Sequence, residues 1–416
     1  MFSRVKGVAD NFLDMAFWTG VRNKIEGHLR QYNFSEIETP VLEYVSLFER
    51  GLGFETDVVS KQMFVIESKG KKDEQICLRP EATAGTMRAF LEQQASLSTP
   101  CKVFSYGSMF RYERPQKGRL RQFHQMNLEV IGAQSIMHDA LLIKMLHTLF
   151  LEKFAIENFV LKINFLGHVA DRQQYSQALQ EFLQAKIAQL CQTCQTRLTT
   201  NVLRILDCKS ESCQHAVQDG PTLQDYFADE TKAEWQLLCD TLHELSVTFV
   251  HDVRLVRGLD YYNKTVFEFV SDALGAQSAF CAGGRYDGLA EQLGSKQSVP
   301  ALGCAIGMER LMLILQEQRE QLSLPEDSLV CIIPFSQEQN KLGLLLADHL
   351  QSHGKTVDVL VDEQKIKNKM KKAHNMGSSF VLLLGETEQA NNTVTVKNMT
   401  TGEEQVVSQA EIHKVV

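Results

Sequence analysis

The segment FSYGSMFRYERPQKGRLRQFHQMNLEVIG, residues 104–132, predicts a β-hairpin with a basic tip. Pro115 and Gly118 mark a loop at its centre, and strand-like runs flank that loop. Five basic residues fall within eleven positions: Arg111, Arg114, Lys117, Arg119 and Arg121. Because a guanidinium can bind phosphate oxygens in pairs, as lysine cannot, we interpret this hairpin as a phosphate-binding element. The alternative is a basic surface loop, which would not explain the interleaved Tyr, Phe and His.

The second arm of the hairpin alternates in polarity. Gln125, Asn127 and Glu129 would point one way, and the apolar residues 126, 128 and 130 the other way. This alternation predicts a strand with one face on the core and a second face that lines a wet cavity.

Four other stretches combine turn residues with charged or aromatic side chains: ICLRPEATAGT (76–86), LVRGLDYYNKTVFEF (255–269), CAGGRYDGL (281–289) and ALGCAIGMERLMLIL (301–315). The second places Arg257, Asp260 and two tyrosines together, which indicates a pocket; the plainer alternative is a turn with half-buried tyrosines. In the third, we expect the glycine pair before Arg285 to let the backbone approach a ligand. In the fourth, Arg310 near a helix start opposes the helix dipole, so it is expected to face a bound anion.

The rest of the chain divides into blocks. The pattern of residues 166–245 predicts a mainly helical insertion. LSLPEDS at 322–328 is typical of a linker. Residues 328–416 alternate strand and helix patterns, with helices closed by Gly354 and Gly377 and a final hairpin, and they predict a mainly parallel α/β domain. A helix expected at 365–376 carries five lysines, either a solvated face or a contact for a phosphate backbone.

Composition limits the class of protein. The 416 residues are 44% apolar and 23% charged, with a net charge of −8, so nucleic acid could be bound only through a local basic patch. No apolar run approaches the ~18–20 residues of a membrane span, and the N-terminus lacks a signal-peptide pattern. We therefore expect a cytoplasmic protein without membrane contact.

Four of the ten cysteines are clustered: Cys191, Cys194, Cys208 and Cys213. They could form a four-thiolate zinc site, but the second pair is spaced more widely than CxxC. The sequence thus favours reduced structural thiols over zinc, as is usual in a cytosolic protein.

In their order along the chain, the motifs resemble those of class II aminoacyl-tRNA synthetases, most closely the histidyl-tRNA synthetases. IETPVLE (37–43), MFRYERPQKGRLRQFHQ (109–125) and GCAIGMERL (303–311) look like the three class II motifs, the proline of the first helping to form a dimer. RGLDYYNKTVFEF (257–269) and AGGRYDGL (282–289) look like signatures of the histidine enzymes. The resemblance covers essentially the whole chain.

This resemblance implies an α+β catalytic domain, an antiparallel sheet flanked by helices, over 1–165 and 246–322. It also implies a helical insertion at 166–245 and an α/β anticodon-binding domain at 328–416. The implied enzyme is a histidine–tRNA ligase that uses ATP, with Mg²⁺, to convert L-histidine to histidyl-adenylate and pyrophosphate. It then transfers histidine to the 3′ end of tRNA(His), works as a homodimer and needs no organic cofactor or protein-bound metal.

The resemblance also implies residue roles. Arg111 and Arg257 would be catalytic, at the α-phosphate. The histidine site would comprise both of these with Glu81, Ala82, Thr83, Gln125, Glu129, Tyr261, Tyr262 and Tyr286. ATP would contact Arg111, Glu113, Arg119, Phe123 and Arg310. The tRNA would contact Arg114, Gln116, Lys117, Lys367 and Lys371.

Ala82 departs from the family, which usually has glycine there, and the N-terminal VKGVADNF keeps only part of the family pattern. Three alternatives remain: a non-catalytic paralogue such as the ATP phosphoribosyltransferase regulatory subunit, a class II enzyme for another amino acid, and a basic RNA-binding module. The first usually lacks the C-terminal domain and has degraded RGLDYY and ATP motifs, both intact here. The histidine signatures disfavour the second, and the carboxylates on the expected pocket faces disfavour the third.

Overall fold

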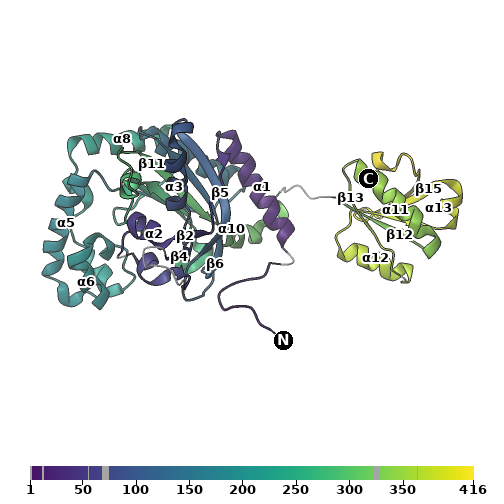
Figure 1. Cartoon of the computed structure of the whole chain (residues 1–416), viewed down its shortest axis with the longest axis horizontal. Helices are drawn as coiled ribbons and strands as arrows, with labels where there is room; N and C mark the ends of the chain where they lie inside the picture. The colour runs from purple at the N-terminus through teal and green to yellow at the C-terminus, as the bar shows by residue number, and fades with distance from the viewer. Residues whose placement is uncertain (1, 12–13, 55, 68–74, 323–327, 363) are drawn as a thin grey trace. The chain divides into compact units, whose positions relative to one another are not determined.

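The computed structural model describes residues 2–11, 14–54, 56–67, 75–322, 328–362 and 364–416. The chain forms two compact units, unit 1 (Met1–Ser323) and unit 2 (Leu324–Val416) (Figure 1). Most of the expected linker, residues 323–327, lies outside the described residues, and the helical segment 166–245 belongs to unit 1.

An eight-stranded sheet forms the centre of unit 1, in the order β1-β5-β6-β11-β10-β9-β7-β8. The six central strands are antiparallel, and the short end strands β1 and β8 pair in parallel with β5 and β7. The bounds are β1 (Ser35–Glu36), β5 (Cys101–Phe110), β6 (Gln122–Ile131), β7 (Val160–Phe165), β8 (Val250–His251), β9 (Asn263–Val270), β10 (Ala279–Arg285) and β11 (Ala301–Gly307). The expected antiparallel sheet is therefore present.

The predicted hairpin is β5 and β6, paired from Cys101↔Ile131 to Phe110↔Gln122. Met126, Leu128 and Val130 are buried on one face of β6, as the alternation predicted. Asn127 and Glu129, on the other face, are buried too. The polar face is therefore the wall of an enclosed site and not an open surface.

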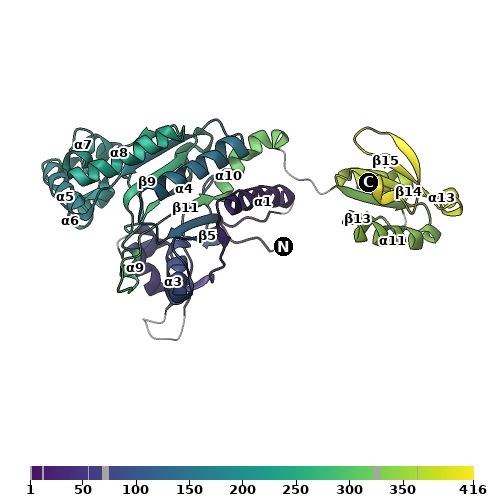
Figure 2. The same ribbon diagram turned by 90° about the horizontal axis from the view of Figure 1, so that it is seen from above.

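Helices cover both sides of this sheet. Figure 2 shows α4 and α10 along one side and α3 and α9 on the other. The helices outside the insertion are α1 (Met15–Gln31), α2 (Val45–Leu52), α3 (Thr83–Gln93), α4 (Met137–Thr148), α9 (Leu289–Gln292) and α10 (Met308–Leu315). A small antiparallel sheet, β2 (Leu42–Tyr44), β4 (Ile76–Leu78) and β3 (Phe64–Val65), precedes α3. Buried Phe48, Met87 and Phe90 from α2 and α3 join Tyr261 and Tyr286 in one apolar cluster, so this core supports the strand ends that carry polar motifs.

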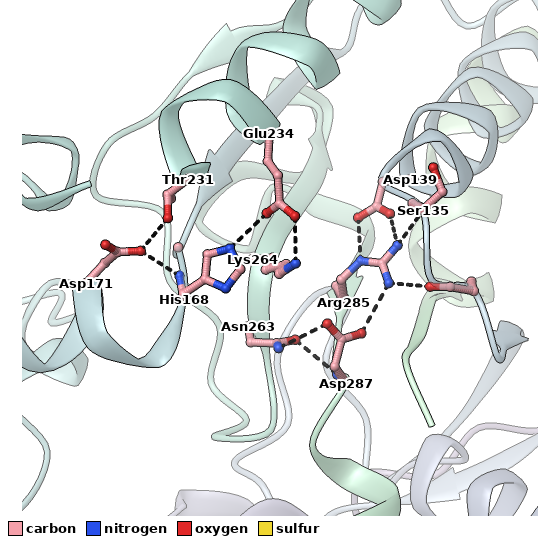
Figure 3. A network of polar contacts seen from close by, with 12 residues as sticks. Ser135, Asp139, His168, Asp171, Thr231, Glu234, Asn263, Lys264, Arg285 and Asp287 are labelled. Atoms are coloured by element: carbon pink, nitrogen blue, oxygen red, sulfur yellow. Dashed lines mark hydrogen bonds and ion pairs between the residues drawn. The ribbon is translucent and has the colours of Figure 1, made fainter. Parts of the chain in front are cut away.

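The insertion is helical and lies at the end of unit 1 away from α1 (Figures 1 and 2). It contains α5 (Val169–Gln184), α6 (Gln192–Thr200), a 3₁₀ turn (Val202–Ile205), α7 (Glu211–Val217) and α8 (Asp229–Glu244). Glu234 on α8 bonds to His168 before α5 and to Lys264 on β9, at 3.1 and 2.9 Å (Figure 3). This link attaches the insertion to a central strand of the sheet.

Unit 2 has a five-stranded sheet in the order β13-β12-β14-β15-β16. Its elements are β12 (Leu329–Pro334), α11 (Gln337–Ser352), β13 (Thr356–Val359), α12 (Ile366–Asn375), β14 (Phe380–Leu384), α13 (Glu386–Asn391), β15 (Thr393–Asn398) and β16 (Glu404–Ser408). β13, β12 and β14 are parallel, whereas the hairpin strands are antiparallel. The expected three parallel strands, glycine-closed helices and final hairpin are all present, and the hairpin adds two antiparallel strand pairs to the sheet.

Candidate active site

A cavity of about 480 Å³ opens on the polar face of the central sheet. Its walls come from β6, β9, β10, β11, the start of α10 and the loop beyond β5. Most predicted binding residues line it: Glu81, Thr83, Arg111, Glu113, Arg119, Phe123, Gln125, Arg257, Tyr261, Tyr262 and Arg310. Segments far apart in the sequence therefore meet at one polar site of a size typical for small ligands.

Glu81, just before α3, forms part of an acidic corner of the cavity. Glu81 accepts hydrogen bonds from the backbone N–H groups of Thr83 and Ala84, at 2.7 and 3.0 Å. Each carboxylate oxygen keeps a further lone pair. Burial raises the pKa of Glu81, opposed by these hydrogen bonds and by the Arg111 charge. A cation bound here would favour the ionised carboxylate.

Glu129 lies deeper and accepts hydrogen bonds from Thr83 Oγ1 (2.7 Å) and the Tyr286 hydroxyl. Its side chain lies against β11 at Gly303, where a Cβ would overlap the carboxylate, so glycine is required there. Burial raises the pKa of Glu129 to about 8, although both hydroxyls favour the anion. On the same face of β6, Gln125 has a buried Oε1 without a hydrogen-bond partner among the described residues. The corner therefore offers acceptors for a ligand that carries N–H groups.

Arginines concentrate positive charge in the other half of the cavity. Arg111 donates to Pro80 O at 2.9 Å and lies 5.4 Å from the Phe123 ring centroid. Arg310 donates to Gly118 O and Ala279 O at 2.9 and 2.7 Å, and Arg119 pairs with Glu113. Burial, together with the charges of Arg119 and Arg111, lowers the pKa of Arg310. A bound polyphosphate would relieve this repulsion.

Arg257 faces this group from the loop before β9. It pairs with Glu268 and lies 5.9 Å from the Tyr262 ring centroid, and its buried Nε has no hydrogen-bond partner in the part of the chain that the structure describes. The rings of Tyr261 and Tyr262 are tilted against each other, with their centroids 4.6 Å apart. Burial raises the pKa of both hydroxyls. These contacts hold the guanidinium in place before any ligand arrives.

The comparisons with known proteins agree with this geometry. A family model described as histidyl-tRNA synthetase matches residues 14–311, and one described as an anticodon-binding domain matches residues 329–416. The chain is 42% identical over 386 residues to a histidine–tRNA ligase of Aquifex aeolicus, covering 92% of this chain and 93% of that protein. It is also 42% identical to the histidine–tRNA ligase of Oleidesulfovibrio alaskensis, covering 97% and 96% of the two chains.

The chain belongs to the histidyl-tRNA synthetase family. The apo histidyl-tRNA synthetase of Staphylococcus aureus has a similar structure, with a TM-score of 0.82, 32% identity and coverage of 100% and 99% of the two chains. The resemblance seen in the motifs is confirmed, and with it the class II fold and the enzyme class, an aminoacyl-tRNA ligase. Among the described residues, no helix is both long and apolar enough to cross a membrane.

Against the residue roles expected for a histidyl-tRNA synthetase, three histidine-site residues lie behind the cavity wall: Glu129, Tyr286 and Ala82. Tyr286 does not line the cavity and reaches the site only through Glu129. Ala82 is buried with φ −108°, a backbone conformation that does not require the glycine usual in the family. The extra methyl therefore neither strains the backbone nor enters the cavity.

Two features of the polar turns do not form part of the cavity wall. Gly283 and Gly284 do not line the cavity, and a Cβ at either position would meet β11, β9 or Tyr262, so close strand packing accounts for the pair. Asp260 is exposed and accepts a hydrogen bond from Asn201 of the insertion at 3.2 Å. In both cases the motif packs one protein segment on another.

Arg285, which follows that glycine pair, also serves the fold. It is fully buried and is held by Asp139, by Asp287 at 3.2 Å and by the carbonyls of Ala133 and Ser135 (Figure 3). It joins β10 to α4 and to the turn before it. Arg285 in this motif therefore forms buried ion pairs that support the fold.

The expected tRNA contacts are exposed: Arg114, Gln116 and Lys117 at the hairpin tip, and Lys367 and Lys371 on α12. Lys369 is not part of this charged face, since it is buried and donates to Pro334 O at 2.9 Å. Lys372 pairs with Asp362 at 3.1 Å. The basic surface of α12 is therefore smaller than its sequence suggests.

Sequence reasoning missed several cavity residues: Asp207, Lys209, Glu268 and Glu309. Glu309 accepts the His124 backbone N–H at 2.9 Å, and its place at a helix start was a usable signal. Glu268 lies between buried Phe267 and Phe269 on β9, so strand alternation places it on the opposite face, and this polar position was also a usable signal. Asp207 and Lys209 come from the insertion, and no local pattern indicates that they reach the cavity.

Proposed function

We propose that this cavity joins L-histidine to ATP and that the product is passed to tRNA(His). Membership of the family makes the chain a histidine–tRNA ligase. The observation that carries the proposed geometry is the division of the cavity into an acidic corner and a cationic half around Arg111 and Arg310. Glu81 and Gln125 line the acidic corner, and Glu129 lies behind it, bonded to the lining residue Thr83.

In the first step, a histidine carboxylate oxygen attacks the α-phosphorus of ATP. The bond from that phosphorus to the bridging oxygen breaks, so pyrophosphate leaves and histidyl-adenylate remains. Negative charge grows on the phosphoryl oxygens, where Arg111 and Arg257 supply fixed charge. Mg²⁺ would accompany ATP and would offset the negative charge of its phosphates. No side chain of the protein acts as a nucleophile.

Histidine is selected in the acidic corner. Glu81, Thr83 and Gln125 hold the α-ammonium group, and the unpartnered Oε1 of Gln125 is suited to that role. Glu129 and Tyr262 bind the imidazole, with Tyr261 beside it and Tyr286 holding Glu129. An isostere that lacks a ring nitrogen would leave these groups unpaired, which can cost up to ~10⁴–10⁵ in kcat/KM.

ATP occupies the cationic half. Phe123 stacks on the adenine, Glu113 and Arg119 hold the nucleotide, and Arg310 binds the γ-phosphate end. The ion pair between Glu113 and Arg119 and the mutual repulsion of Arg119, Arg111 and Arg310 support this assignment.

In the second step, a hydroxyl of the tRNA's terminal ribose attacks the histidyl carbonyl, and AMP leaves. The exposed hairpin tip, Arg114, Gln116 and Lys117, approaches the acceptor end, which in the family carries an extra 5′ guanosine. Lys367 and Lys371 on α12 contact the anticodon region. Their exposure supports these roles.

The chain acts as a cytoplasmic homodimer in this proposal. Val41, Leu42 and Tyr44, in and beside the IETPVLE segment, are 39%, 49% and 56% exposed, and such apolar groups suit a subunit interface. Sedimentation analysis is expected to give twice the mass of one chain, and a monomer at enzyme concentrations would contradict it.

ATP–pyrophosphate exchange, measured with each of the twenty amino acids, tests the function. Exchange with histidine alone is expected. If the folded protein binds histidine but no amino acid supports exchange, the ligase assignment fails and a histidine-binding regulatory subunit becomes the better description.

A further inference from the structure

The insertion contains a second site, separate from the cavity walls, formed by four cysteines. The sulfur atoms of Cys191, Cys194, Cys208 and Cys213 all lie within 4.8 Å of one another, and the first and third are 3.9 Å apart. Four thiolates around one zinc ion at ~2.3 Å would be about 3.8 Å apart at tetrahedral angles. The spacing in the structure is close to that value.

The backbone around the cluster is arranged to stabilise thiolates. Cys191 is the N-cap of α6, where the helix N-terminus favours negative charge. The Cys213 sulfur accepts the backbone N–H of Cys191 at 3.1 Å. Such donors stabilise a charged sulfur more than a neutral thiol.

The segment that carries the cluster contains only short helices. Between α5 and α8 its longest helix has nine residues and the next has seven. A segment of this size usually needs a disulfide or a metal to stay ordered. Disulfides would join sulfurs in two separate pairs at ~2.05 Å, whereas here all four converge and all are free.

We infer that Cys191, Cys194, Cys208 and Cys213 bind one structural zinc ion. The wide Cys208–Cys213 spacing, which in the sequence favoured plain thiols, is accommodated because Cys213 lies in the first turn of α7. Four thiolates leave no open position for a substrate, as in structural zinc sites. A multi-iron cluster would hold the thiolates further apart than they are here.

The zinc site also supports the active-site cavity. Cys208 stands between Asp207 and Lys209, and both neighbours line the cavity. Arg204, just upstream, donates to Gly258 O at 3.1 Å, next to Arg257. The metal therefore fixes a wall segment that no regular helix or strand holds, and its loss would loosen the loop that carries Arg257.

Metal analysis of the purified full-length chain, after dialysis against a weak chelator, tests the inference. The wild-type chain is expected to keep one zinc per chain and the double variant Cys191→Ser/Cys194→Ser none. Cys239→Ser, a half-buried cysteine of α8 outside the cluster, is the matched control and should keep the zinc. Equal zinc in the wild type and the double variant would overturn the site.

A second measurement, on the wild-type chain alone, does not depend on the folding of a variant. Cobalt exchanged into the protein is expected to give an intense sulfur-to-metal charge-transfer band and the visible bands of a tetrahedral ion. Three histidines in unit 2, His349, His353 and His413, also lie close together, so His413→Gln must leave these bands unchanged. Absence of the sulfur band, or a native mass that shows two disulfides and no metal, would refute the proposal.

Discussion

Replacing Glu129 by glutamine is expected to stabilise the free protein and at the same time impair it. The pKa of this buried carboxyl is raised from its ordinary 4.5 to about 8, so the folded state holds its proton while the unfolded state loses it. Wild-type stability therefore falls as the pH rises through that window, because the folded state binds more protons there. Each pH unit in this window lowers the free energy of unfolding of the wild type by ~1.36 kcal/mol. Between pH 5 and pH 8 the free energy of unfolding of the variant should therefore rise by up to about 4 kcal/mol relative to that of the wild type. Above pH 8 the difference in the free energy of unfolding between the variant and the wild type becomes constant.

Urea unfolding at several pH values, followed by tryptophan fluorescence, measures this difference. Both tryptophans, Trp18 and Trp235, belong to unit 1, so the signal reports on the unit that holds Glu129. Glu157→Gln, at an exposed position, is the control and should show no such trend.

Histidine binding by the same variant should change in the opposite direction. The bound imidazole N–H favours the ionised form of Glu129, which an amide cannot adopt, and hydrogen bonds to charged groups contribute ~1.5–3 kcal/mol, or about 10–100-fold in Kd. Calorimetric titration with histidine gives this value. A variant that is less stable at every pH yet binds histidine normally would show that Glu129 only supports the fold, and would refute our reasoning.

Three further substitutions test other parts of the molecule. Asp139→Asn removes the fully buried one of the two carboxylates paired with Arg285 and leaves Asp287, so it should lower the free energy of unfolding by up to ~3–5 kcal/mol in the same fluorescence assay; an unchanged value would mean that the Asp139 pair is dispensable. Arg111→Lys keeps the charge but loses the planar fork, and pyrophosphate exchange should slow ~10–100-fold, since hydrogen bonds to charged groups contribute ~1.5–3 kcal/mol; a wild-type rate would remove Arg111 from the reaction. Gln116→Ala should leave exchange intact and slow transfer to tRNA about 2–10-fold, as for one lost hydrogen bond, and impaired exchange would place Gln116 in the first step instead.

Local patterns predicted much of this molecule because they are repeated along single strands and helices. The alternation in β6 identified its two faces, and the glycine-closed helices outlined unit 2. The six-residue α13 was missed, because a helix that short has no clear periodicity.

Features that depend on non-local packing could not be read in the same way. Gly283 and Gly284 have the same appearance in sequence whether they make room for a ligand or for a neighbouring strand. Lys369 looks like its exposed neighbours until the β12 carbonyl that it caps is known. Asp207 and Lys209 reach the cavity only through the way the insertion packs. That packing brings Cys191, Cys194, Cys208 and Cys213 together, which the sequence spacing alone does not show.

The most direct test of the proposed mechanism is single-turnover formation of histidyl-adenylate by Arg257→Ala at saturating histidine and ATP. Arg254→Ala is the matched control, since Arg254 lies on the same loop but donates to Gln218 O at 3.2 Å and does not line the cavity. Loss of one preorganised group that stabilises the transition state predicts a rate ~10²–10³-fold lower in the first variant and unchanged in the control. A rate in Arg257→Ala that returns to the wild-type value at saturation would show that Arg257 only helps to bind substrate, and would contradict its role at the α-phosphate.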